Sequence, residues 1–241
     1  MTIDPSRRAP VVFLHGAAQD ASAAHWLDVP GLMATNLPGH GGRRRPRPGL
    51  RFVDMADEIA GWAREPLHLV GVGLGGNTAL VFALDYPHLI RSLVLVSTLA
   101  HTNNQMVEER ARETERLGNL AMVPGAMQRW FSAQALAKAP RPEPIAYAEA
   151  RMSRIPTAVM ADVWRSALDY DVRDRLGSIR VPTTCVGGAY DAFMPSSEIE
   201  AMTRSIPGAR FVELKAAHMA AHLEVPAEFS KVVRDHLARI E

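Results

Sequence analysis

Six short apolar runs, separated by segments of helical pattern, constrain the fold of this chain more than any other feature. Several runs have no polar face, which is typical of strands buried on both sides of a sheet. Strands that alternate with helices form a mostly parallel, doubly wound α/β sheet, here of about six strands. The predicted strands are Val11–Leu14, Leu32–Leu37, Leu67–Val72, Leu93–Val96, Pro182–Val186 and Arg210–Leu214, and the predicted helices around them are Phe52–Arg64, Asn77–Asp85, Ile199–Ser205 and Pro226–Ile240.

Polar or glycine-rich segments follow these runs. In an open parallel sheet, ligands bind beyond the carboxyl ends of the strands, so these segments are the expected site. They are His15-Gly16, Pro38–Gly42, Gly71–Gly76, Ser97-Thr98, Asp191 and His218.

Residues 101–170 differ in composition, with many arginines, alanines, methionines and glutamates and no strand-like run. We expect several short helices there, forming a lid over the site. The predicted domains are therefore a core at 1–100 and 171–241 and a helical lid at 101–170. An arginine of this lid that points inward would bind an anionic group of a substrate.

Four motifs, each after a predicted strand, resemble those of the α/β-hydrolase superfamily. They are Phe13–Gly16, Asn36–Gly41, Gly187–Pro195, and Ala217–Met219 with Leu223–Pro226 behind it. Their order along the chain matches that family. Within it, the chain is similar to 3-oxoadipate enol-lactonases and related C–C bond hydrolases. The resemblance implies a hydrolase or lyase of the α/β-hydrolase fold.

The central motif of that family, Gly-x-Ser-x-Gly on a strand–turn–helix, reads Gly71-Val72-Gly73-Leu74-Gly75 in this chain. Gly73 stands at the position of the nucleophilic serine. Glycine has no side chain and cannot be acylated, so the usual acyl-enzyme route is closed at this position.

The resemblance implies roles for the remaining site residues. His218 would be the general base and Asp191 its orienting carboxylate, while the N–H groups of Leu74 and Ala17 would form an oxyanion hole. His222 is a rival for the role of His218. Further residues expected in the pocket are His15, Gly16, Ser97, Trp130 and Trp164.

Three functional hypotheses stay open. The first is a cofactor-free enzyme that uses His218 and Asp191 on a small carbonyl compound, with water or substrate in the space at Gly73. The second is a serine hydrolase, an esterase or lactonase, inactivated by the substitution to Gly73. The third is a non-catalytic ligand-binding or partner-binding protein on a hydrolase scaffold.

Composition and spacing argue against other classes. A formal net charge of +1 is not typical of a nucleic-acid binder, and the scattered histidines with one cysteine, Cys185, give no metal-ligand spacing. Gly71, Gly73 and Gly76 also match a dinucleotide fingerprint, but they lie in the third strand–helix unit without the acid that motif needs. Because residues 1–10 have no apolar signal region and no segment is typical of a membrane span, we expect a cytoplasmic protein.

Two departures from the family bear on architecture. Only ten residues precede Val11, so the usual N-terminal hairpin is expected to be largely absent. The stretch between Trp26 and Asn36 is short for a first helix and the strand after it, so a reduced or missing first helix is expected. A homodimer that covers the edge exposed on this side is the expected assembly.

Overall fold

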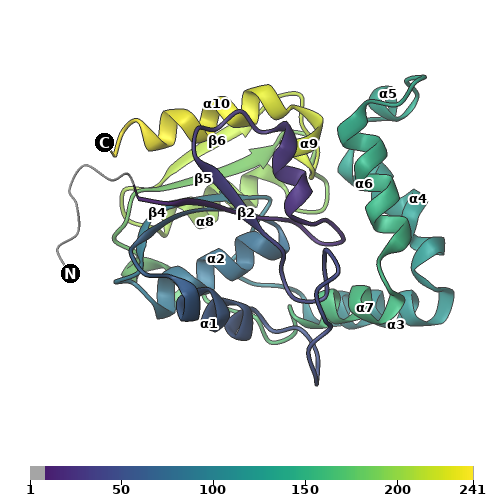
Figure 1. Cartoon of the computed structure of the whole chain (residues 1–241), viewed down its shortest axis with the longest axis horizontal. Helices are drawn as coiled ribbons and strands as arrows, with labels where there is room; N and C mark the ends of the chain where they lie inside the picture. The colour runs from purple at the N-terminus through teal and green to yellow at the C-terminus, as the bar shows by residue number, and fades with distance from the viewer. Residues whose placement is uncertain (1–8, 241) are drawn as a thin grey trace.

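The computed structural model describes residues 9–240, and they form one six-stranded parallel sheet with strand order β2-β1-β3-β4-β5-β6 (Figure 1). This confirms the predicted doubly wound sheet. The strands are β1 (Val11–Leu14), β2 (Leu32–Thr35), β3 (Leu67–Val72), β4 (Ile90–Val96), β5 (Thr183–Gly188) and β6 (Arg210–Leu214).

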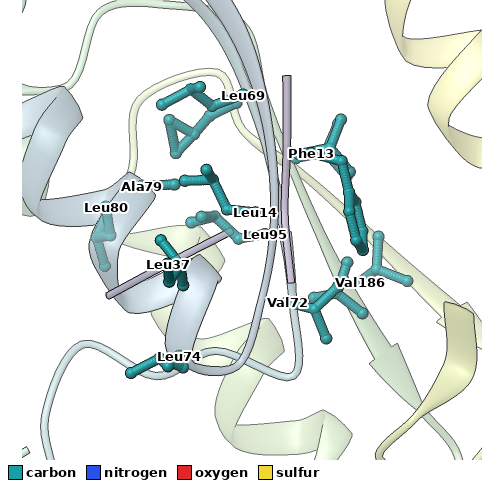
Figure 2. Close-up of a cluster of buried hydrophobic side chains, with 14 of the residues drawn as sticks. Phe13, Leu14, Leu37, Leu69, Val72, Leu74, Ala79, Leu80, Leu95 and Val186 are labelled. Carbon is teal, nitrogen blue, oxygen red and sulfur yellow. The ribbon is translucent and has the colours of Figure 1, made fainter. Parts of the chain in front are cut away.

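The central strands are buried on both faces. Successive residues of a strand point to opposite sides, so Phe13 and Leu14 of β1 enter different layers of the core. Figure 2 shows Phe13 and Val72 on one side of the sheet and Leu14 and Leu69 on the other. The continuous apolar runs that marked these strands in the sequence therefore reflect burial on both faces.

Helices cover the two faces of the sheet. Helices α1 (Phe52–Trp62) and α2 (Leu74–Asp85) pack together on one face, and α10 (Pro226–Leu237) lies on the other (Figure 1). Every residue of α2 from Leu74 to Leu84 is buried, which explains its uniformly apolar sequence. The remaining core elements are η1 (Ala21–Trp26), η2 (Arg173–Ser178), α8 (Ser196–Arg204) and α9 (Ala221–Glu224).

Five helices follow β4 and lie together at one end of the sheet (Figure 1). An isolated antiparallel bridge between His101 and Asp171 joins the two ends of this helical segment. Its role as a lid stays a prediction. The helices are α3 (Asn104–Leu117), α4 (Asn119–Trp130), α5 (Ala133–Leu136), α6 (Glu143–Arg154) and α7 (Thr157–Arg165).

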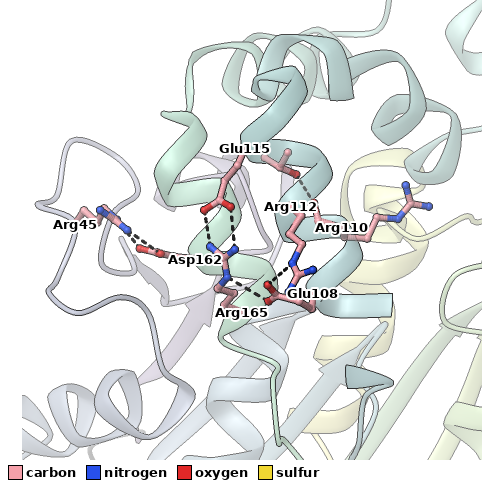
Figure 3. A network of polar contacts seen from close by, with 8 residues as sticks. Arg45, Glu108, Arg110, Arg112, Glu115, Asp162 and Arg165 are labelled. Atoms are coloured by element: carbon pink, nitrogen blue, oxygen red, sulfur yellow. Dashed lines mark hydrogen bonds and ion pairs between the residues drawn. The ribbon is translucent and has the colours of Figure 1, made fainter. Parts of the chain in front are cut away.

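Charged contacts fasten α7 to its neighbours (Figure 3). Arg165 on α7 donates to Glu115 at 2.5 and 2.9 Å and to Glu108 at 3.3 Å, both on α3. Arg45, from the loop before α1, donates to Asp162 on α7 at 2.5 and 2.9 Å. Bidentate arginine–carboxylate pairs of this kind fix orientation, although their exposed members contribute little free energy.

Several boundaries differ from the predicted ones. Strand β2 ends at Thr35 and not at Leu37, because the chain there turns toward the Pro38–Gly42 loop. Helix α2 begins at Leu74, three residues earlier than predicted, because it starts directly from the turn at Gly73. A single six-residue 3₁₀ helix, η1, stands between β1 and β2, as expected for a reduced first helix. The expectation about an N-terminal hairpin concerns residues 1–8, outside the described residues.

Candidate active site

The turn between β3 and α2 has the backbone of a nucleophile elbow. Gly73 has φ 49° and ψ −109° and precedes the first turn of α2. A Cβ on Gly71 would come within 2.5 Å of the Gly75 carbonyl oxygen, and one on Gly75 within 2.2 Å of the Leu14 carbonyl oxygen. Other parts of the backbone lie so close to Gly71 and Gly75 that only glycine fits at either position. This explains why both glycines of the Gly-x-Ser-x-Gly motif are present.

Gly73 itself has space around it. A Cβ built there would meet its first non-neighbouring atom, the carbonyl oxygen of Ser97, only at 4.0 Å. The position where a nucleophile would stand is thus open, and the side chain is missing for a reason other than crowding.

Gly73 lines a cavity of about 120 Å³ between the sheet edge and the helices α3, α4, α6 and α7. A cavity of this size class holds a small organic molecule. Trp164 and Phe193, with ring centroids 5.9 Å apart, form part of a wall that is mostly apolar. Of the residues predicted for the site, those that line the cavity are Gly16, Ala17, Gly73, Leu74, Ser97, Trp130 and Trp164.

The backbone N–H groups of Ala17 and Leu74 have no acceptor among residues 9–240. Leu74 is the first residue of α2, where N–H groups have no partner inside the helix and the helix dipole is positive. Both residues line the cavity beside Gly73, so an anionic oxygen placed there would meet two free donors.

His15, predicted for the pocket, does not line this cavity. Its ring is fully buried; Nε2 accepts the Leu37 N–H at 3.0 Å and Nδ1 donates to the Gly16 carbonyl at 2.9 Å. Burial, with the positive charge of the neighbouring His40 as the second cause, lowers its pKa to about 3. The neutral ring therefore holds two loops together.

Asp191, after β5, is buried and accepts three hydrogen bonds. Oδ1 accepts the N–H groups of Met194 at 2.8 Å and Phe193 at 3.0 Å, and Oδ2 accepts the Ser97 hydroxyl at 3.0 Å. Burial raises the pKa of Asp191, while these three bonds and then the charge of His218 act to lower it. Ser97, directly after β4, has a positive φ of 43°, which is a strained conformation for a residue other than glycine.

His218 lies near Asp191 but has a different hydrogen-bond partner. Its Nδ1 is 3.2 Å from Glu224 Oε2, which also accepts the His218 backbone N–H at 2.8 Å. Its ring stacks on Tyr190 with centroids 5.4 Å apart. In the part of the chain that the structure describes, no hydrogen bond joins His218 to Asp191, and Met219 and Ala220 line the cavity while His218 does not.

Two buried residues that line the cavity, His222 and Gln19, form a pair. His222 was expected near the site as a rival of His218, whereas Gln19 was not predicted. His222 Nε2 is 2.8 Å from Gln19 Oε1, and no described group pairs with its Nδ1. Because the amide oxygen can only accept, Nε2 carries the proton and Nδ1 is the bare nitrogen. Burial lowers the pKa of His222 to about 3, so the ring is neutral. Gln19 follows β1, and its place in a loop at the carboxyl end of a strand is the sequence feature that could have identified it as a site residue.

No group of three or more histidine, cysteine, aspartate or glutamate side chains within residues 9–240 is arranged to hold a metal ion. Nor does the described part of the chain contain a helix with the length and apolar character needed to span a membrane.

Comparison with known families gives one match over most of the chain. A family model described as the alpha/beta hydrolase fold matches residues 9–225. Solved structures agree: the enol-lactonase from Burkholderia xenovorans has a TM-score of 0.88 at 22% identity, covering 98% of this chain and 94% of that one. A thermophilic esterase from Thermogutta terrifontis also has a TM-score of 0.88, at 24% identity, covering 97% of this chain and 90% of the other.

Curated relatives are hydrolases as well. The pyrrolizixenacetamide deacetylase of Xenorhabdus hominickii is 30% identical over 175 residues, which are 71% of this chain but only 65% of that protein. Monoacylglycerol lipase ABHD6 of Rattus norvegicus is 25% identical over 98% of this chain and 77% of its own length.

Proposed function

The chain belongs to the alpha/beta hydrolase fold family and is a hydrolase of that superfamily, and on this premise we propose that it cleaves a small carbonyl compound without a cofactor and without a serine nucleophile. The observation that carries the proposal is the open position at Gly73 inside an elbow whose other glycines are kept in place by close backbone contacts. A water molecule or a substrate atom would occupy this position.

The proposed reaction is attack of water on the substrate carbonyl. His218 does not line the cavity, but the next residue in the chain, Met219, does. In the proposed reaction the His218 ring turns toward the cavity and takes a proton from the water as the water oxygen bonds to the carbonyl carbon, and the carbonyl oxygen becomes an oxyanion. The N–H groups of Ala17 and Leu74 donate to that oxyanion. Collapse of the tetrahedral species breaks the bond to the leaving group, which receives the proton from His218.

Two carboxylates support His218 as the base. Glu224 Oε2, 3.2 Å from Nδ1, favours a proton on Nδ1 and so leaves Nε2 as the basic nitrogen. Asp191 is close enough for His218 to influence its pKa, and its negative charge would stabilise the imidazolium that forms.

One observation favours a second candidate, a protein that binds its ligand without turnover. Asp191 accepts its hydrogen bonds from Ser97, Phe193 and Met194, and not from the ring of His218. The elbow conformation retained at Gly73 equally suits a serine hydrolase that has lost its nucleophile.

The test is hydrolysis of a panel of activated aryl esters by the native protein, His218→Ala and His88→Ala. His88 is an exposed histidine outside the cavity, so its variant controls for histidine loss alone. The proposal expects turnover by the native protein and by His88→Ala, and a loss of about 10²-fold or more in His218→Ala. Equal rates for all three proteins would exclude His218 as the base.

A further inference from the structure

The arginines of the helical segment α3–α7 fall into two groups. Most of them meet a carboxylate: Arg110 pairs with Glu113 at 3.0 Å, Arg112 with Glu108 at 2.9 Å, and Arg151 with Asp20 at 2.8 Å. Arg141 pairs with Glu149, and Arg165 with Glu108 and Glu115. Those without a carboxylate among residues 9–240 are Arg116, Arg129 and Arg154.

Arg129 differs from the other two unpaired arginines in its surroundings. Arg116 and Arg154 are exposed, so water solvates them. Arg129 is half-buried in the last turn of α4 and lines the same cavity as Gly73. Its Nη1 lies beside Gly125, 3.4 Å from the place where a Cβ on that residue would stand.

The charges around Arg129 do not neutralise it. Burial is the main cause that lowers its pKa, and the positive charge of Arg110 lowers it further. Glu113 acts in the opposite direction, but its carboxylate already accepts from Arg110 at 3.0 Å. A cation withdrawn from water without a partner is costly, and an anion that reaches it recovers that cost.

We propose that the compound bound in this cavity carries a carboxylate, which Arg129 binds through its free guanidinium N–H groups. The proposal rests on the proposed function in taking the cavity at Gly73 as the substrate site. The ligand would place its carbonyl group beside Gly73, its apolar body against Trp130 and Trp164, and its carboxylate at Arg129. Planar guanidinium–carboxylate pairing would then select substrates that have an acid group.

Binding calorimetry on the native protein tests this without any need for turnover. The probes are aliphatic and aryl carboxylates of graded length, each matched with its uncharged primary amide. The same titrations are made with Arg129→Gln and with Arg116→Gln, the latter removing an exposed, unpaired arginine of the same segment.

We expect at least one carboxylate to bind the native protein and Arg116→Gln about tenfold or more tightly than its amide, a preference of the size of a charged hydrogen bond. Arg129→Gln should bind the two alike. The inference is overturned if no carboxylate binds more tightly than its amide, or if Arg129→Gln keeps the preference. Because binding and ester turnover are measured separately, loss of one result leaves the other standing.

Discussion

The same alanine substitution is predicted to have very different effects at Gly73 and at Gly75. A Cβ on Gly75 would lie 2.2 Å from the Leu14 carbonyl oxygen, about 1.2 Å short of the 3.4 Å at which ordinary contact begins. The atoms that would have to move belong to the backbone of β1, which is paired with β2 on one side and β3 on the other. Overpacking of this kind costs more than about 3 kcal/mol in free energy of unfolding.

At Gly73 the only cost of alanine is conformational. The backbone conformation of φ 49° and ψ −109° costs a non-glycine residue about 1–3 kcal/mol, and no atom outside the two neighbouring residues lies closer than 4.0 Å to the added Cβ. Loss of freedom in the unfolded chain returns about 0.4–1 kcal/mol to both variants alike. With the strain at Gly73 taken near the middle of that range, Gly73→Ala should lose about 1 kcal/mol and Gly75→Ala at least about 1 kcal/mol more.

Urea unfolding and thermal melting of the two variants measure this difference. For a chain of this size, about 1 kcal/mol corresponds to a difference in Tm of at least about 2 °C. If Gly73→Ala destabilised the protein as much as Gly75→Ala, the position would not be open and the argument for water at that place would fail.

Three further predictions concern buried polar groups. Because burial lowers the pKa of His222 to about 3, below the unfolded value near 6.5, its contribution to stability is complete above pH 6.5 and is lost as the pH falls; at pH 5 the loss is about 2 kcal/mol. His222→Gln should accordingly show a shallower fall in Tm between pH 7 and pH 5, and an unchanged slope would contradict this. Gln19→Leu removes the acceptor of the buried His222 Nε2–H and should cost about 1–3 kcal/mol in urea unfolding, whereas the exposed Gln105→Leu should stay within about 0.5 kcal/mol. Ser97→Ala removes a donor to the buried Asp191 carboxylate and should cost about 1–3 kcal/mol by the same assay; a neutral effect would show that Asp191 finds another donor.

The sheet could be predicted because its strands are buried on both faces, which leaves continuous apolar runs such as Leu67–Val72 in the sequence. The elbow could be located because close backbone contacts leave no room for a Cβ at Gly71 or Gly75, and this requirement fixes the residue type in the sequence. The predicted start of α2 was less accurate. Its glycines at Gly75 and Gly76 are typical of a turn, but in the structure they lie in the first turn of the helix, where they allow close packing.

The partners of the site side chains could not be predicted in the same way. The preference of His218 for Glu224 over Asp191 depends on the path of the loop after β6, which spacing along the chain does not reveal. Nor could the sequence show which arginine of the helical segment faces the cavity. Arg110 pairs with Glu113, whereas Arg129 lines the cavity, and only the packing of the helices distinguishes the two. The catalytic assignment of His218 and Asp191 stays a prediction.

The most direct test of the account is the pre-steady-state time course of aryl-ester hydrolysis by the native protein and by Gly73→Ser. The native protein should release product linearly, without a burst, since it has no nucleophile to acylate at Gly73. An inert native protein beside a serine variant that shows a burst and turnover would contradict catalysis without a serine nucleophile. That result would identify the chain as a serine hydrolase without its nucleophile.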